Sequence, residues 1–95
     1  MTYYVAIIED AGPDHAVGVW FPDLPGCFAA GDTLDEALLN APEAVALWIE
    51  AQGGSAPQAR TPSELRSDPE TSADMAAHAI ALIPAPGLSL QPAAK

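Results

Sequence analysis

The chain has 95 residues, which suits a single domain, and hydrophobic residues make up 49% of it, which argues against extensive disorder. Thirteen acidic residues face three basic ones, for a formal net charge of −10, and residues 1–59 contain no Lys or Arg. Because phosphate contacts need these cations, the composition argues against direct binding to nucleic acid or to anionic membrane surfaces.

The excess of acidic residues has two interpretations. A basic protein is the natural partner, because complementary charge steers the association of two proteins. Alternatively, the negative surface only keeps the protein soluble. Charge alone does not separate these two interpretations.

The cysteine content and the two ends of the chain predict a cytoplasmic protein. A single cysteine cannot form an internal disulfide, and the N-terminus lacks the positive region of a signal peptide before it reaches Glu9 and Asp10. The uncharged run Met75–Ala94 is long enough to cross a membrane, but prolines and Gly87 interrupt it. We therefore interpret this run as a strand followed by a Pro-rich tail over residues 85–95.

The first thirty residues predict a three-stranded antiparallel meander, with strands over residues 3–8, 16–21 and 27–30. In the second strand, alternation places Trp20 on the face opposite Val17 and Val19. The remaining elements are expected to leave this second face and the sheet edges open. Tyr4 can join Trp20 there in an exposed aromatic patch, and we expect a homodimer or a higher even oligomer.

Two prolines and a glycine make the connection over residues 22–26 rigid. Pro22 and Pro25 each hold the preceding residue in an extended conformation. Asp23 is expected to accept a backbone N–H bond of its own turn, and Gly26 is expected to adopt a positive φ. We interpret this connection as a structural clamp first and a contact surface second.

The main helix is predicted to begin with a capping box. Thr33 is the expected N-cap and Glu36 the N3 residue, and Gly53–Gly54 ends the helix. Pro42 lies inside it and predicts either a kink or a restart with Asn40 as a second cap. The expected apolar face recurs every three or four residues and comprises Leu34, Leu38, Ala41, Val45, Trp48 and Ile49.

A second capping pattern follows, with Thr61 as N-cap, Pro62 at N1 and Glu64 at N3. It predicts one or two helical turns that end near Pro69. Residues 77–85 then predict a final strand. The fold class is α+β in the order β-β-β-α-(short α)-β, with the main helix covering one face of the sheet.

Residues with catalytic potential are few and scattered. A metal nuclease could gather carboxylates at strand ends, where four acidic residues lie: Glu9, Asp14, Asp23 and Asp32. Each of them also sits in a turn or cap where acids have local roles. His15 and Cys27 could form a nucleophilic pair, but a lone cysteine is usually a small buried hydrophobe. We predict no catalytic residue, no metal and no cofactor.

Two stretches, YYVAIIE from Tyr3 and GVWFPDLPGCFAAGDTLDEALLNAPEAV from Gly18, are similar to the HicB-like antitoxin domain of bacterial toxin–antitoxin pairs. The resemblance extends over Tyr3–Gln52, and its specific part is FPDLPGC followed by GDTLDEAL. It implies a partial ribonuclease-H-like fold without the nuclease carboxylates. It also implies a non-enzymatic inhibitor that binds a small basic HicA-like toxin of double-stranded-RNA-binding fold and blocks the toxin's catalytic histidine.

Many members of that family continue into a DNA-binding domain, whereas this sequence stops at Lys95. We therefore expect a HicB-like domain over residues 1–84, the tail over 85–95 and no direct DNA binding. The alternative to an antitoxin is an orphan HicB-like domain that self-associates as a regulatory or scaffold protein. The candidate partner-binding residues are Asp14, Trp20, Asp23, Leu24, Asp35 and Glu43, with Leu24 expected to be exposed at a loop tip.

Overall fold

The computed structural model describes residues 2–86, so most of the predicted tail lies outside the described residues. Its elements are β1 (Tyr3–Asp10), β2 (Val17–Trp20), β3 (Phe28–Gly31), α1 (Leu34–Ala51), α2 (Pro62–Ser67), α3 (Ser72–Ala77) and β4 (Ala79–Pro84). Among the described residues, we find no helix with the length and apolar character needed to cross a membrane. The α+β class and the order of the strands agree with the prediction, and α3 is an additional helix.

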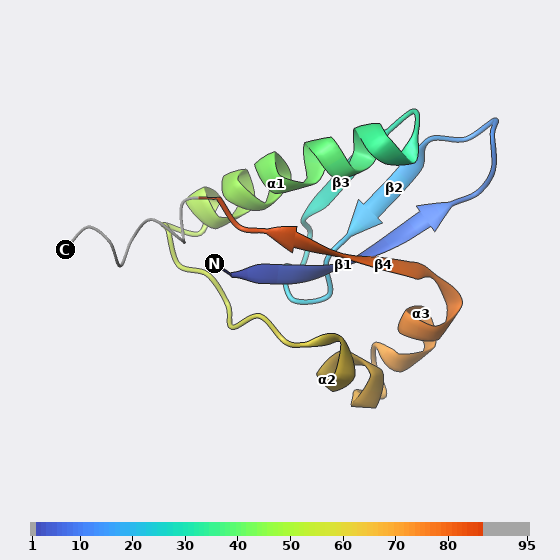
Figure 1. The fold of residues 1–95 in the computed structure, drawn as a ribbon. Coiled ribbons are helices and arrows are strands. Elements are labelled where there is room, and N and C mark those ends of the chain that lie inside the picture. Colours follow the sequence, from blue (N-terminus) through green and yellow to red (C-terminus); the bar gives the residue numbers. More distant parts are fainter. Residues whose placement is uncertain (1, 87–95) are drawn as a thin grey trace.

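The four strands form one antiparallel sheet in the order β3-β2-β1-β4 (Figure 1). The predicted meander of the first three strands is confirmed, and the last strand returns to pair with the first. Val19 of β2 lies opposite Ile8 of β1 and Ala29 of β3. β2 and β1 therefore each have a neighbouring strand on both sides, while β3 and β4 are the edge strands.

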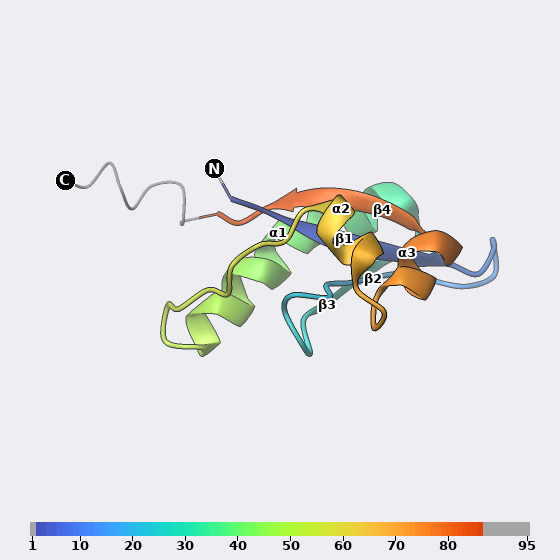
Figure 2. The same ribbon diagram turned by 90° about the horizontal axis from the view of Figure 1, so that it is seen from below.

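The helices cover both faces of the sheet. α1 lies over one face, whereas α2 and α3 lie over the other, as the view from below makes clear (Figures 1 and 2). The prediction of an open second face was therefore wrong. The second face is covered because Leu65 of α2 and Met75 of α3 both pack on it. Helix α3 was not predicted; Thr71 is its N-cap, but the Thr71 side chain makes no cap hydrogen bond. The final strand is correspondingly shorter than predicted.

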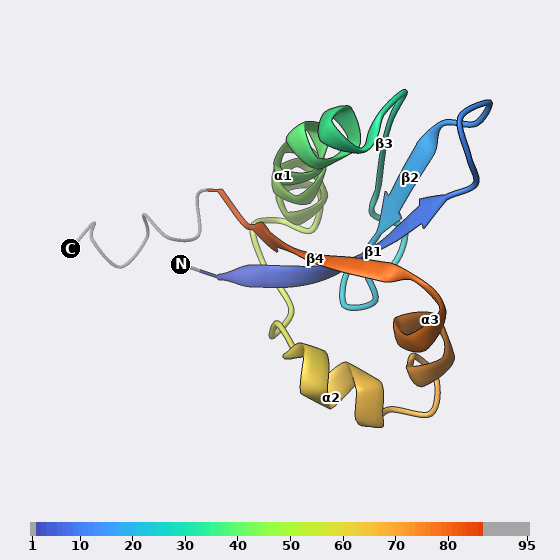
Figure 3. The ribbon, with the colours of Figure 1, turned by 45° about the vertical axis from the view of Figure 1, so that its right-hand side comes forward.

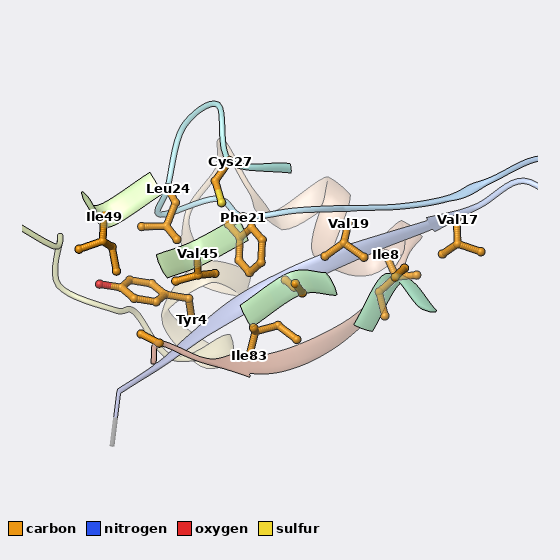
Figure 4. Packing of buried hydrophobic residues seen from close by; sticks show 14 residues of the cluster. Tyr4, Ile8, Val17, Val19, Phe21, Leu24, Cys27, Val45, Ile49 and Ile83 are labelled. Carbon is orange, nitrogen blue, oxygen red and sulfur yellow. The ribbon is translucent and has the colours of Figure 1, made fainter. Parts of the chain in front are cut away.

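Two groups of buried side chains result. The small core lies under α2 and α3 and consists of Val5, Ile7, Leu65 and Met75. The main core lies under α1 (Figure 4) and consists of Tyr4, Ala6, Ile8, Val17, Val19, Phe21, Leu24, Cys27, Ala37, Ala41, Val45, Ile49, Ile83 and Ala85. Tyr4 is thus a residue of the main core and does not share a face with Trp20. An aromatic patch formed by these two residues was a wrong expectation.

Helix α1 begins at the predicted cap, but the capping box is only half formed. The Thr33 hydroxyl accepts the Glu36 N–H at 3.2 Å, whereas the Glu36 carboxylate accepts the Asp32 N–H at 3.0 Å. The helix continues through Pro42 without a restart. Asn40 does not cap a second helix, because its side-chain amide donates to the Ala30 carbonyl of β3 at 2.9 Å.

The buried face of α1 consists of residues at steps of four: Ala37, Ala41, Val45 and Ile49. Leu34 was expected on this face but is exposed. The small side chains near the start of the helix let it approach β3 closely, and Figure 3 shows the two side by side. At Gly31, a Cβ would lie 2.6 Å from the Glu36 Cβ, so only glycine fits at this contact.

Candidate functional site

The predicted rigid connection forms two consecutive tight turns, which we call the 21–27 turn (Phe21–Cys27). The Leu24 N–H donates to the Phe21 carbonyl at 3.1 Å, and the Cys27 N–H donates to the Leu24 carbonyl at 3.0 Å. Gly26 has a φ of +84°, which confirms the positive φ expected there. The turn is therefore an ordered part of the fold.

Leu24 is fully buried, contrary to the expectation of an exposed loop tip. The double turn directs its side chain inward beside Phe21 and Val45 (Figure 4). A buried leucine offers no contact surface to a partner. Its packing against the other buried residues stabilises the turn. Flanking prolines set the backbone of a loop, but they do not decide which way a side chain points.

Asp23 forms an ion pair with Arg60, which also pairs with Asp68. We call this group of three residues the Arg60 clamp. The Asp23 carboxylate accepts the Arg60 backbone N–H at 2.8 Å and the Arg60 Nε–H at 2.7 Å. The Asp23 side chain is only 7% exposed. Asp23 was predicted to bond within its own turn and to be available to a partner. It instead bonds to a residue 37 positions later.

The clamp also reaches Asp68, which directly follows the last residue of α2. Arg60 Nη1 donates to the Asp68 carboxylate at 2.7 Å. The Glu70 N–H and Arg60 hold the pKa of Asp68 below its usual value, and both aspartates raise the pKa of Arg60. Burial, and secondarily the charge of Asp23, raise the pKa of Tyr4, whose hydroxyl donates to the Pro57 carbonyl. The Arg60 clamp thus ties the 21–27 turn to both ends of α2, through Arg60 before the helix and Asp68 after it.

A second tie connects the 21–27 turn to α1. The Trp48 indole N–H donates to the Pro25 carbonyl at 2.8 Å. Cys27 is buried, its sulfur lies 3.5 Å from the Ala44 carbonyl, and burial raises the pKa of its thiol. The interpretation of Cys27 as a small buried hydrophobe is confirmed, and His15 is exposed in the loop between β1 and β2.

The other predicted contact residues lie on several elements. Asp14 is exposed in the loop between β1 and β2, and Asp35 and Glu43 are exposed on α1. Trp20 is half-buried and packs on the small core, so it contributes less surface than expected. Among residues 2–86, no three His, Cys, Asp or Glu side chains lie close enough together to hold a metal ion.

Exposed hydrophobic side chains gather near β3 and were not among the contact residues expected from the sequence. Of the six large hydrophobic residues that are exposed within residues 2–86, four lie on β3 or α1: Phe28, Leu34, Leu39 and Leu47. Beside them is a shallow groove, which we call the α1–β3 groove, lined by Gly26, Cys27, Phe28, Ala44, Leu47 and Trp48. Leu39 and Leu47 lie outside the buried every-fourth-residue face, and this spacing is the sequence signal that could have identified them.

Comparison with known proteins places this geometry among toxin–antitoxin proteins. A family model described as the HicB-like antitoxin of bacterial toxin–antitoxin systems matches residues 3–86. The structure is similar to the antitoxin HicB of Burkholderia pseudomallei, with a TM-score of 0.69, 27% identity and coverage of 88% of this chain and 63% of that one. It is also similar to a chain of a HicA3–HicB3 toxin–antitoxin complex, with a TM-score of 0.65, 28% identity and coverage of 87% and 96%.

Two curated relatives each match about half of this chain. A 14.9 kDa protein from the rep–hol intergenic region of Haemophilus phage HP1 is 53% identical over 47 residues, which are 50% of this chain and 34% of that protein. A UPF0150 protein of Thermoplasma acidophilum is 45% identical over 51 residues, which are 54% of this chain and 71% of that protein. The aligned segment thus spans about a third of the phage protein.

Proposed function

This chain belongs to the HicB-like antitoxins of bacterial toxin–antitoxin systems, and we propose that it binds and neutralises a small basic mRNA-cleaving toxin. It acts without catalysis, in the cytoplasm, by covering the active site of the toxin. The match over residues 3–86 carries the proposal, and the complex of HicA3 with HicB3 supports a toxin of the HicA type as the partner. Direct DNA binding by this chain is not part of the proposal.

The distribution of charge supports a basic partner. Residues 1–59 contain no Lys or Arg, and Arg60 is neutralised by two aspartates. A cationic toxin would meet a surface on which acidic side chains far outnumber basic ones. Because exposed charge pairs are screened by salt, the association rate should fall as ionic strength rises. An association rate that does not change with salt would contradict an electrostatically steered complex.

The direct experiment pairs this chain with a small basic protein of the HicA type, sought first in the reading frames that neighbour its gene. We expect the two proteins to copurify, and we expect the purified chain to stop that protein from cleaving mRNA. The chain alone should not cleave RNA with Mg²⁺ or Mn²⁺ present. A full-length chain that neither binds that protein nor reduces RNA cleavage would contradict the antitoxin function and favour the orphan alternative.

We also propose that the chain forms a homodimer or a higher even oligomer. Its interface differs from the patch of Tyr4 and Trp20 that was first expected. Leu82 of the edge strand β4 and Tyr3 of β1 are both exposed. The register pairs Val5 with Leu82 and Tyr3 with Pro84, so Tyr3 and Leu82 lie diagonally on one face. Sedimentation at tens of micromolar tests the assembly, and a 9.8 kDa monomer alone would contradict it.

A further inference from the structure

The α1–β3 groove is a preformed feature with two exposed apolar walls. Phe28 on β3 is 70% exposed and Leu47 on α1 is 59% exposed. Trp48 also lines the groove, and its indole N–H donates to the Pro25 carbonyl at 2.8 Å. This bond and the double turn hold the two walls at a set separation. A partner that enters the groove therefore has little conformational entropy of this chain to overcome.

The composition of the groove resembles the centre of a protein interface. Aromatic anchors surrounded by polar groups carry much of the binding energy in such interfaces. Here Phe28 and Trp48 supply the aromatic surface, and Leu47 adds an exposed aliphatic side chain. On the outer side of α1, Leu39 is also exposed and extends the apolar surface along the helix.

The edge of the groove on α1 is acidic. Glu43 lies one helical turn before Leu47 and Glu50 lies one turn after it, and both are exposed. The helix also carries Asp35 and Glu36 in its first turn and contains no Lys or Arg. A partner that fits this surface must place cations around an apolar side chain. A second copy of this chain fits poorly, because its own groove is equally acidic.

We propose that the α1–β3 groove receives an apolar side chain of the basic toxin, while Glu43 and Glu50 pair with cations beside it. The proposal rests on the function proposed above and names the contact surface for that function. It replaces two of the contact residues expected from the sequence, Asp23 and Leu24, with Phe28 and Leu47. The 21–27 turn then acts as the support of the site, because it positions Trp48 and Phe28.

The first test compares the same substitution at two exposed leucines. Leu47→Gln alters the groove, and Leu34→Gln alters the start of α1, where Leu34 is 41% exposed and does not line the groove. Neither change adds charge, and both should leave the melting temperature nearly unchanged because the side chains are exposed. Titration with the HicA-type basic protein should show at least tenfold weaker binding for Leu47→Gln and unchanged binding for Leu34→Gln.

The second test examines the acidic edge. Glu43→Gln should slow association with the same basic protein and reduce its dependence on salt. Glu9→Gln is the matched control, since Glu9 is also exposed but lies on β1. A Glu43→Gln variant that retains both the wild-type association rate and its salt dependence would count against the acidic edge.

The outcomes separate this inference from the function on which it rests. A wild-type chain that fails to bind the basic protein contradicts the proposed function itself. If the wild-type chain binds and Leu47→Gln binds equally well, the function stands and the groove proposal is overturned. A Leu47→Gln variant that loses self-association while retaining toxin affinity would assign the groove to a second copy of this chain, which also overturns the proposal.

Discussion

The two faces of the sheet are covered by different means. Under α1, the main core has fourteen buried residues, and the 21–27 turn contributes Phe21, Leu24 and Cys27 to it (Figure 4). Under α2 and α3, only four buried residues form the small core, and each of these helices has six residues. A helix this short gains little stability by itself. The second face therefore depends on tertiary contacts, especially Leu65 and the Arg60 clamp.

The comparison predicts the largest loss of stability at the centre of the main core. Leu24→Ala should lower the free energy of unfolding by about 4 kcal/mol, because it removes a fully buried leucine from a closely packed site. Urea unfolding measures the loss. Leu39→Ala is the control, since Leu39 is 78% exposed and its truncation should cost less than about 0.5 kcal/mol. Equal losses in the two variants would contradict the assignment of Leu24 to the core.

A smaller and more local loss is expected on the second face. Leu65→Ala should cost about 2–3 kcal/mol, because the short helices around it can move into part of the cavity. Amide hydrogen exchange should show lost protection in α2 and α3 while α1 retains most of its protection. If protection falls equally in α1, the two faces unfold as one unit and the distinction between them is wrong.

The Arg60 clamp connects the two regions, so its removal tests their coupling. Arg60→Ala leaves the nearly buried Asp23 carboxylate with one fewer hydrogen bond and no paired cation. Because Arg60 is 35% exposed, we expect a loss of about 2 kcal/mol, below the range for fully buried pairs. Thermal unfolding measures this loss of stability. The control is Arg66→Ala, because Arg66 is an exposed residue of α2. A loss no larger than that of Arg66→Ala would mean that the clamp adds no stability.

A substitution that strains the backbone of the 21–27 turn should cause a smaller loss of stability. Gly26→Ala should cost about 1 kcal/mol through its positive φ alone, since no atom lies within 4 Å of the added Cβ. Gly18→Ala is a matched control, because its surroundings are equally open and its φ is not in the left-handed region. Melting temperatures of the two variants that do not differ would show that the turn tolerates a Cβ at Gly26.

The smallest effect concerns pH. The pKa of Asp68 is lower in the folded protein than its ordinary value of 3.8. The stabilisation by Asp68 is therefore complete above pH 3.8 and is lost as the pH falls through the lower folded value. The melting temperature of the wild type should be higher than that of Asp68→Asn at pH 6, and this difference should disappear as the pH falls below 3.8. A difference that stays constant over this range would contradict the shift.

The sequence by itself determined the elements whose signals are local. Thr33 and Thr61 mark the starts of α1 and α2 because a cap is formed within four residues of chain. The positive φ of Gly26 and the order of the first three strands follow from equally short patterns. The family was identified from one such stretch, because two rigid turns and a capped helix must agree in spacing.

Only the tertiary structure decided where these elements place their side chains. β1 is buried on both faces, so alternation could not show that Tyr4 faces α1 while Val5 faces α2 and α3. Helix α3 has no side-chain cap and is stabilised by burying Met75 in the small core. Asp23 finds its partner 37 residues away, and the α1–β3 groove forms only when β3 lies beside α1. Such contacts depend on how distant segments pack, and no window of a few residues contains that information.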